Sequence, residues 1–404
     1  MKKPSVYWRS IIIMTALIII LALTCLITPF CDWYADHIYG VLCDGMSRVT
    51  GMLPFALGEI VMYIGAAMAV MSIFILLLLI FLRKKKGYRK FCGGFFKTFL
   101  MALVIVVLLY MPTWTIPFCG SLLGRSNADL KKEYTYKEMH TLLEYIVTNA
   151  NAAAAEIEIS EDGKVNFPTE EDTRSGINKA MLAISDDFPR LKGYYPPVKT
   201  ALCSDILERM GIGGYNYPFT MEPTHNKYLS PTFRPVLDAH ELTHHKGYYK
   251  ENEANFLSEL ALTKSDDPFL RLSGFHDMYY YVYDDYCTAQ SEVIERMIKN
   301  GEIDIQLPIE TKEEFQKFVN ICNEIFGPDP QFDDRVYRIM IAGNEIEQQI
   351  YEEDSHPLDD IPQADEIISD VADTGWSVQE EVLQENYYSD VVLLLLQYYD
   401  GKLY

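Results

Sequence analysis

The sequence predicts a mainly α-helical protein in which three N-terminal transmembrane helices precede a predominantly helical domain with a short edge strand or small sheet. The first third of the chain contains three apolar stretches long enough to cross a bilayer. The rest is polar and acidic, and most of it has the apolar periodicity of helices. One stretch there is instead rich in glycine, tyrosine and proline. We therefore expect a membrane region at 1–119 and a second domain at 120–404.

The three apolar stretches lie at about 10–29, 60–82 and 96–118. Crossing about 30 Å of hydrocarbon takes about 20 helical residues. Only a helix or a closed barrel satisfies its own backbone there, so we expect three helices. A cleaved signal peptide is the alternative for the first stretch, but its apolar run is long and no small-residue cleavage site follows it.

Basic residues predict the orientation of these helices, because cytoplasmic loops are enriched in lysine and arginine. They precede the first stretch and fill the loop between the second and third, whereas the loop between the first and second is acidic. We expect the N-terminus in the cytoplasm and the domain after Phe118 outside it. The basic residues are Lys2, Lys3, Arg9, Arg83, Lys84, Lys85, Lys86, Arg89, Lys90 and Lys97.

Charge and cysteine usage exclude some functions. The formal net charge is −22 although the membrane region is basic, so the second domain is strongly acidic and nucleic acid is not an expected partner. No CxxC pair is present, which argues against a cysteine zinc site. Cys31 and Cys43 share the short outer loop and could pair.

Helical periodicity in the second domain predicts several further elements. Glycine, tyrosine and proline in 211–220 (GIGGYNYPFT) predict an extended edge strand, with a turn-rich loop as the alternative. The acidic stretch 352–377 is typical of an exposed loop. A buried terminal helix is expected at 378–399, because its run VVLLLL is too short for a span. The other expected helices are 134–151, continuing through 152–155, then 171–190, 197–210, 312–326 and 333–351.

The segment 235–247 (PVLDAHELTHHKG) carries the clearest chemical signal. Pro235 and Gly247 are helix start and stop signals, so His240, Glu241 and His244 belong to one short helix. Residues four apart share a face, which lets both imidazoles reach one metal ion. Zn²⁺ takes three protein ligands in such sites and keeps one position open for water. Glu241 is then the expected general base.

A carboxylate on the following segment 251–262 (ENEANFLSELAL) is the expected third ligand. The segment resembles the E-x-x-A-N/D pattern that follows HExxH in several zincin groups. That resemblance implies that Glu251 binds zinc and that Asn255, four residues on, supports the site. Glu253 is the alternative ligand, but helix geometry places Asn255 on the face of Glu251.

Other polar residues near the motif are assigned more ordinary roles. His245 points about 100° away from His244, so we expect it at the surface or beside the site. Asp238 and Lys246 depart from the stricter peptidase pattern. This departure weakens the prediction of proteolysis more than the prediction of metal binding. Glu59 is expected at the membrane boundary. We expect His140, His225 and His276 to be structural or exposed rather than ligands. The sequence does not choose an oxyanion-stabilising residue among Tyr248, Tyr249, His276, Tyr279, Tyr280 and Tyr281.

The three spans together with GGYNYPFT, HELTHHKG, ENEANFLSELAL and RLSGFHDMYYYVY resemble an uncharacterised bacterial domain-of-unknown-function family of multi-pass membrane proteins with an HExxH, gluzincin-like motif. The resemblance covers most of the chain and is most specific at 211–262. It implies a gluzincin-like domain outside the bacterial plasma membrane, with Zn²⁺ on His240, His244 and Glu251.

The expected function is a membrane-anchored zinc metallopeptidase acting on a peptide or protein substrate. The alternative is a membrane-anchored sensor or binding protein that keeps the zinc site without turnover. The sequence determines neither the substrate nor the oligomeric state.

Overall fold

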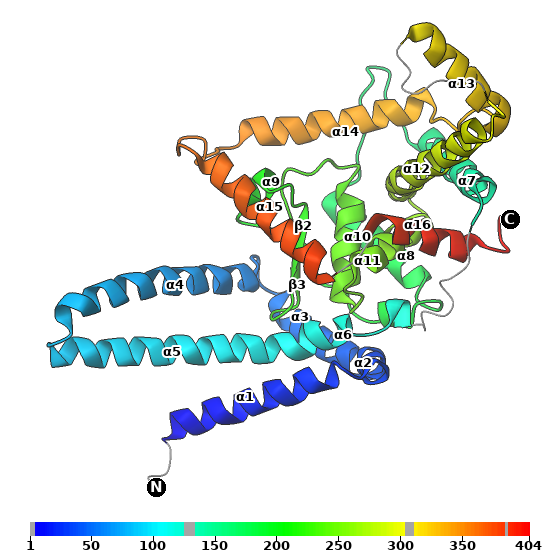
Figure 1. Cartoon of the computed structure of the whole chain (residues 1–404). Coiled ribbons are helices and arrows are strands. Elements are labelled where there is room, and N and C mark those ends of the chain that lie inside the picture. The colour runs from blue at the N-terminus through cyan, green and yellow to red at the C-terminus, as the bar shows by residue number, and fades with distance from the viewer. Residues whose placement is uncertain (1–4, 125–133, 304–310, 384–386) are drawn as a thin grey trace.

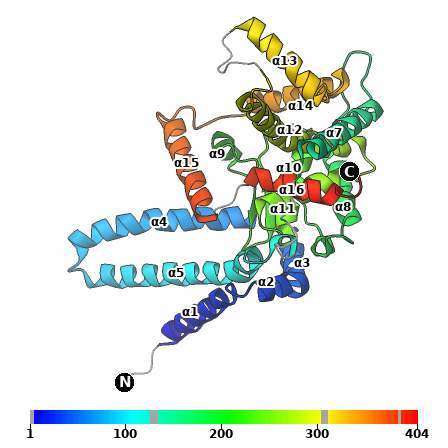
Figure 2. The ribbon, with the colours of Figure 1, turned by 45° about the vertical axis from the view of Figure 1, so that its right-hand side comes forward.

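The structure is a computed structural model that describes residues 5–124, 134–303, 311–383 and 387–404. Three long helices project side by side from one face of a helical domain (Figures 1 and 2). They are α1 (Val6–Thr24), α4 (Leu57–Leu82) and α5 (Lys86–Tyr110). All three are long and apolar enough to cross a membrane, which indicates a membrane protein. Helix α1 ends before Pro29, the limit we predicted, because that proline lies in the first turn of the next helix.

The third membrane helix continues past Tyr110 without a break. A π-helical turn, η2 (Met111–Thr115), leads into the short helix α6 (Ile116–Phe118). The outer loop between the first two spans is also helical and consists of α2 (Thr28–Tyr34), the π-helical turn η1 (Ala35–Tyr39) and α3 (Gly40–Thr50). Both segments lie where the long helices meet the domain (Figure 1).

The domain packs its helices around one hydrophobic core. Helix α7 (Tyr136–Glu156) contributes Leu142, Leu143 and Ile146, none of which is exposed. Against it packs the longest helix of the described chain, α12 (Pro268–Lys299), which Asp267 caps by accepting from the amides of Phe269 and Leu270. The other helices that contribute to this core are α8 (Glu170–Ala183), α10 (Arg234–His245), α11 (Glu251–Leu262), α14 (Asp334–Glu353) and α16 (Tyr387–Tyr399). The prediction of a mainly helical domain is confirmed.

A small sheet lies beside α10. Its strands are β1 (Lys199–Thr200), β2 (Gly214–Tyr217) and β3 (Glu222–His225), in the order β1-β3-β2. Strand β2 pairs antiparallel with β3 and lies at one edge. The edge strand expected in the glycine- and tyrosine-rich stretch is thus present, and the turn-rich alternative is excluded.

Three expected elements differ from the structure. The helix predicted at 171–190 ends early, because α8 stops at Ala183. The helix predicted at 197–210 is shortened to α9 (Ser204–Arg209), because Lys199 and Thr200 pair with β3 instead. The loop predicted at 352–377 is confined to 354–363, between α14 (Asp334–Glu353) and α15 (Ala364–Leu383). Helix α15 forms there because Ala364, Ile368 and Ala372 recur every four residues and supply one less exposed face among the acidic side chains.

The peripheral helices agree better with prediction. Helix α13 (Lys312–Phe326) and helix α14 follow the expected ranges closely. The terminal stretch 378–399 divides between the end of α15 and α16. Val391 and Leu395 on α16 have no exposed surface, so the run VVLLLL is buried in the domain as expected.

All eight cysteines are free in the structure. Cys31 and Cys43 lie in one continuous helical segment, and their separation of twelve positions corresponds to a rise of about 18 Å. A disulfide requires Cα atoms within about 7 Å. The pairing considered from the sequence is therefore sterically impossible in this fold.

Buried carboxylates join the second span to the domain. Glu222 on β3 accepts hydrogen bonds from the amides of Leu57 and Gly58, at 3.1 and 2.9 Å, and so caps α4. It also forms an ion pair with Lys199, and both side chains are almost fully buried. A second carboxylate makes the opposite connection: Glu59, in the first turn of α4, accepts hydrogen bonds from the backbone amides of Leu202 and Cys203 in the domain. Glu59 is only 1% exposed, and its carboxylate binds the domain at the first turn of α4, where the second span begins.

We predict that Glu222→Gln destabilises the protein by about 3 to 5 kcal/mol, because it leaves the ammonium of Lys199 buried without a counter-charge. Thermal unfolding of the full chain in nanodiscs measures this. Asp186→Asn is the matched control, because it breaks the exposed Lys192–Asp186 pair and should change the free energy of unfolding by less than about 1 kcal/mol. Equal stability of the two variants would contradict the prediction.

Candidate metal centre

Helix α10 carries the HExxH motif and has the expected ends. Pro235 lies in its first turn, and the chain leaves the helix at Gly247, whose φ is +87°. A Cβ at Gly247 would also lie 2.9 Å from the ring of Tyr39 on η1. Glycine is therefore required both to end α10 and to let the outer-loop helix approach it.

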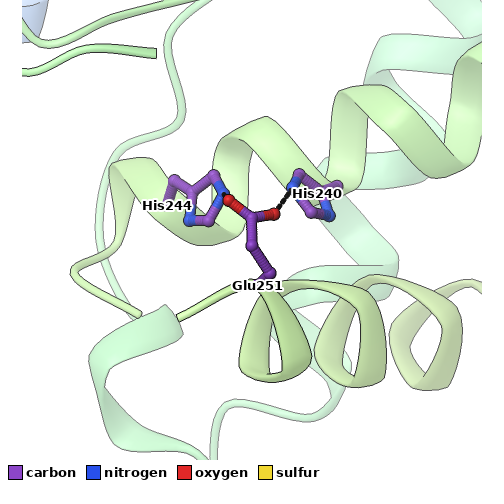
Figure 3. Close-up of side chains that lie close together, drawn as sticks. All are labelled: His240, His244 and Glu251. Carbon is purple, nitrogen blue, oxygen red and sulfur yellow. Dashed lines mark ion pairs between the residues drawn. The ribbon is translucent and has the colours of Figure 1, made fainter. Parts of the chain in front are cut away.

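The two motif histidines and Glu251 converge on one point (Figure 3). His240 and His244 lie one turn apart on α10, with ring centroids 4.6 Å apart. Glu251 is the first residue of α11, and its carboxylate lies between them: one oxygen is 3.2 Å from Nε2 of His240 and the other 3.6 Å from Nε2 of His244. The potential ligand atoms all lie within 4.8 Å of one another.

These distances fit a small tetrahedral ion. Tetrahedral bonds of about 2.0 to 2.1 Å separate neighbouring ligand atoms by roughly 3.4 Å. The two nitrogen–oxygen distances, 3.2 and 3.6 Å, lie on either side of that value. Two imidazoles and one carboxylate also match the donor set of zinc sites that keep a fourth position open.

Hydrogen bonding prepares His244 for such a role. Its Nδ1 lies 2.9 Å from the carbonyl oxygen of Tyr248, which can only accept, so Nδ1 carries the proton and Nε2 faces Glu251. Burial disfavours the charged imidazole, but the nearby carboxylate outweighs it and raises the pKa of His244 to about 9. Conversely, the two histidines hold the pKa of Glu251 well below its usual range despite its burial.

Glu241 lies between the group of His240, His244 and Glu251 and the sheet. Its side chain is 4% exposed, and burial raises its pKa to about 7 against the opposing effect of His240 and His244. Its Oε2 is buried and has no hydrogen-bond partner among the described residues. A Cβ at Gly214 on β2 would lie 2.8 Å from Oε1. The edge strand therefore runs directly against this carboxyl group.

The structure separates the two candidate third ligands. Glu253 is buried away from the histidine pair and accepts hydrogen bonds from the amides of Leu123 and Lys250. It thereby ties the start of α11 to the chain after the third span. Asn255 lies one turn beyond Glu251 on α11, where its backbone carbonyl accepts from the hydroxyl of Ser258.

The two departures from the stricter motif have structural roles. Asp238 forms a buried pair with His225 of β3, with 2.7 Å between Oδ1 and Nδ1, and so fixes α10 to the sheet. Lys246 donates to the carbonyl oxygens of Lys192 and Tyr194 and pairs with Asp44 of α3. Both charges therefore attach α10 to its neighbours at places away from the metal-binding face.

His245 is fully buried, so the surface position expected for it is wrong. Its Nε2 lies 3.1 Å from Sγ of Cys43 on α3, and burial, reinforced by the nearby Lys246, holds its pKa well below the usual range. A neutral imidazole packs here against the outer-loop helix. The isolated histidines are not part of the three-residue group: His140 bonds Tyr286, His225 bonds Asp238, and His276 stacks on Phe332.

The tyrosine candidates for oxyanion stabilisation have other contacts. Tyr249 is buried, and its hydroxyl donates to the carbonyl of Thr113. Tyr248 packs under the guanidinium of Arg190. Tyr279 stacks on Tyr283 and Phe332.

Sequence reasoning missed three polar groups near the motif. Tyr215 on β2 is exposed and lies within electrostatic reach of Glu241. Asn216 is buried, with both amide atoms unpartnered among the described residues. Alternation along β2 puts it on the same face as Gly214, which touches Glu241.

The third group is a buried carboxyl pair, Glu259 and Asp277, near His240. Burial raises the pKa of both, that of Asp277 to about 6, and neither carboxyl oxygen of Glu259 has a hydrogen-bond partner among the described residues. The sequence could indicate only one half of this pair, because Glu259 lies four residues after Asn255 on α11. Asp277 comes from a different helix, α12.

Comparison with known proteins locates the chain among sequence families. No curated protein and no solved structure matches it. A family described as "Protein of unknown function (DUF3810)" matches residues 34–328. The match begins in the outer-loop helix and includes the second and third spans, the sheet, α10 and α11. Because it covers most of the chain, this protein belongs to the DUF3810 family of proteins of unknown function.

Proposed function

We propose that the protein is a membrane-anchored zinc-dependent metallopeptidase in which His240, His244 and Glu251 bind Zn²⁺ and Glu241 is the general base. The observation that carries the proposal is the position of the Glu251 carboxylate, 3.2 and 3.6 Å from two imidazole nitrogens of the preceding helix. A bound zinc ion would lower the pKa of a water molecule and polarise a peptide carbonyl.

Glu241 is suited to proton transfer in this reaction. Its pKa of about 7 lies near neutral pH, where a base can both take and return a proton. Its buried Oε2 is free to accept a hydrogen bond from the attacking water. The proton that Glu241 takes from that water would pass to the leaving amine.

Strand β2 supports a peptide as the substrate. It pairs with β3 on one side only, and its second edge is unpaired within the part of the chain that the structure describes. An extended peptide can add to such an edge through main-chain hydrogen bonds. Gly214 would place that peptide beside Glu241.

We further propose that the domain lies outside the cytoplasm of a bacterial cell and that the N-terminus lies inside. The basic stretch 83–90 comprises the connection between α4 and α5 and the first turns of α5, at the end farthest from the domain (Figure 1). Loops rich in lysine and arginine stay in the cytoplasm, so the domain would be on the other side of the plasma membrane.

We expect the purified full chain to bind one zinc ion, and we expect His240→Ala and His244→Ala to abolish stoichiometric binding, because two ligands cannot hold the ion in place of three. Metal analysis after gel filtration measures the content. His140→Ala is the control, because that histidine bonds Tyr286 away from the site and should leave the content unchanged. Unchanged zinc in His240→Ala would rule out this centre.

The third ligand can be identified by comparing two isosteric variants. Glu251→Gln should lose zinc, because it removes the charged ligand. Glu253→Gln should keep zinc but lower the free energy of unfolding by about 1 to 3 kcal/mol, because a buried acceptor of two amides is replaced in part by a donor. The reverse pattern would assign the ligand to Glu253.

We predict that Glu241→Gln keeps its zinc and loses peptide hydrolysis by about 10² to 10⁴-fold, because the change removes the base and spares the ligands. Hydrolysis is measured on a quenched-fluorophore peptide library with metal content determined in parallel. Full activity in Glu241→Gln would exclude this residue as the base. Zinc binding without turnover in the unmodified chain would instead favour a sensor or binding protein.

A further inference from the structure

The metal centre is joined to the third span by a single side chain. The ring of Tyr249 stacks on His244, with centroids 6.0 Å apart and planes 11° apart. Its hydroxyl donates to the carbonyl of Thr113 in η2, at 2.6 Å, and its ring also meets that of Trp114. A single residue, Tyr249, thus lies between the proposed ligand His244 and the helical turn that continues the third span.

The edge strand also contacts a membrane helix, in this case the second span. Tyr217 of β2 lies so close to Gly58 in the first turn of α4 that a Cβ there would overlap its ring. The histidine side and the edge-strand side of the proposed reaction centre therefore both contact the domain-facing ends of membrane helices.

Aromatic side chains indicate where the bilayer surface lies. Tyr110, Trp114 and Phe118 stack in succession at the outer end of the third span, with centroids 5.1 and 4.6 Å apart. Tryptophan and tyrosine gather at the level of the lipid headgroups. The ring of Trp114 also contacts the ring of Tyr249. The side chain that packs on His244 therefore lies at the level of the headgroups.

The outer-loop helix gives independent evidence for the same level. Its inner face is buried and holds Tyr39 and Cys43, which contact Tyr249 and His245. Its other face carries four large apolar side chains that are exposed, Trp33, Ile38, Val41 and Val49, and the exposed Met52 follows just after the end of α3. Exposed apolar side chains on a helix of this kind are typical of the lipid interface, and here both of its ends lead into membrane spans. One helix, about 10 Å across, therefore separates α10 from lipid.

We propose that the substrate is a membrane-tethered polypeptide, cleaved in the extended segment next to its membrane anchor; this rests on the proposed peptidase function. The hydrogen bonds of Glu222, Glu59 and Tyr249 hold the centre at the membrane surface. A fixed centre of this kind meets anchored chains at a high effective concentration, and only where the chain leaves the bilayer.

The test uses the zinc-loaded full chain reconstituted in phosphatidylcholine vesicles and one quenched-fluorophore peptide in three forms. The first is palmitoylated through a short linker of about three residues. The second is palmitoylated through a rigid linker of about fifteen prolines, which extends about 45 Å from the surface. The third carries no lipid. Glu241→Gln is the control for the protein, and total lipid and peptide concentrations are matched.

We expect the short-linker peptide to be cleaved at least about tenfold faster than the proline-linker peptide, since both are equally concentrated on the vesicle and differ only in height. Equal rates for these two would overturn the tethered-substrate proposal while leaving the peptidase function intact. Cleavage of none of the three forms, with zinc bound, would overturn the peptidase function itself and this inference with it.

Discussion

The Glu251 carboxylate between His240 and His244 is the interaction on which the rest of the site depends. It joins two consecutive helices, α10 and α11, across a connection of only five residues. It also decides the local electrostatics, because a negative carboxylate beside two imidazoles in a partly buried space favours a shared proton or a cation that balances its charge. The raised pKa of His244 and the lowered pKa of Glu251 express that requirement.

The surroundings hold this arrangement through buried charges that are each paired. Asp238 pairs with His225 and fixes α10 to β3, while Lys246 fixes the other end of α10 to α3. Glu222 and Glu59 fix the sheet to α4. Buried charges without partners would cost several kcal/mol each, so these contacts constrain the position of the sheet and the helix strictly. Membrane region and domain consequently form one continuous structure around the site.

Much of this could be predicted from the sequence because the relevant signals are local. Apolar length identified the spans, and the spacing of His240 and His244 with a glycine stop identified α10. The roles of Asp238, Lys246 and His245 could not be predicted, because their partners, His225, Asp44 and Cys43, are distant in sequence. Composition also misled at 364–377, where acidic residues suggested a loop and a four-residue apolar repeat forms α15.

The central claim is that one zinc ion is bound by two imidazoles and a carboxylate, and zinc-edge X-ray absorption of the purified full chain tests it most directly. We expect a four-coordinate spectrum with only nitrogen and oxygen neighbours at about 2.0 to 2.1 Å and the multiple scattering of two imidazole rings. A spectrum with sulfur at about 2.3 Å, or a preparation that retains no zinc, would contradict it.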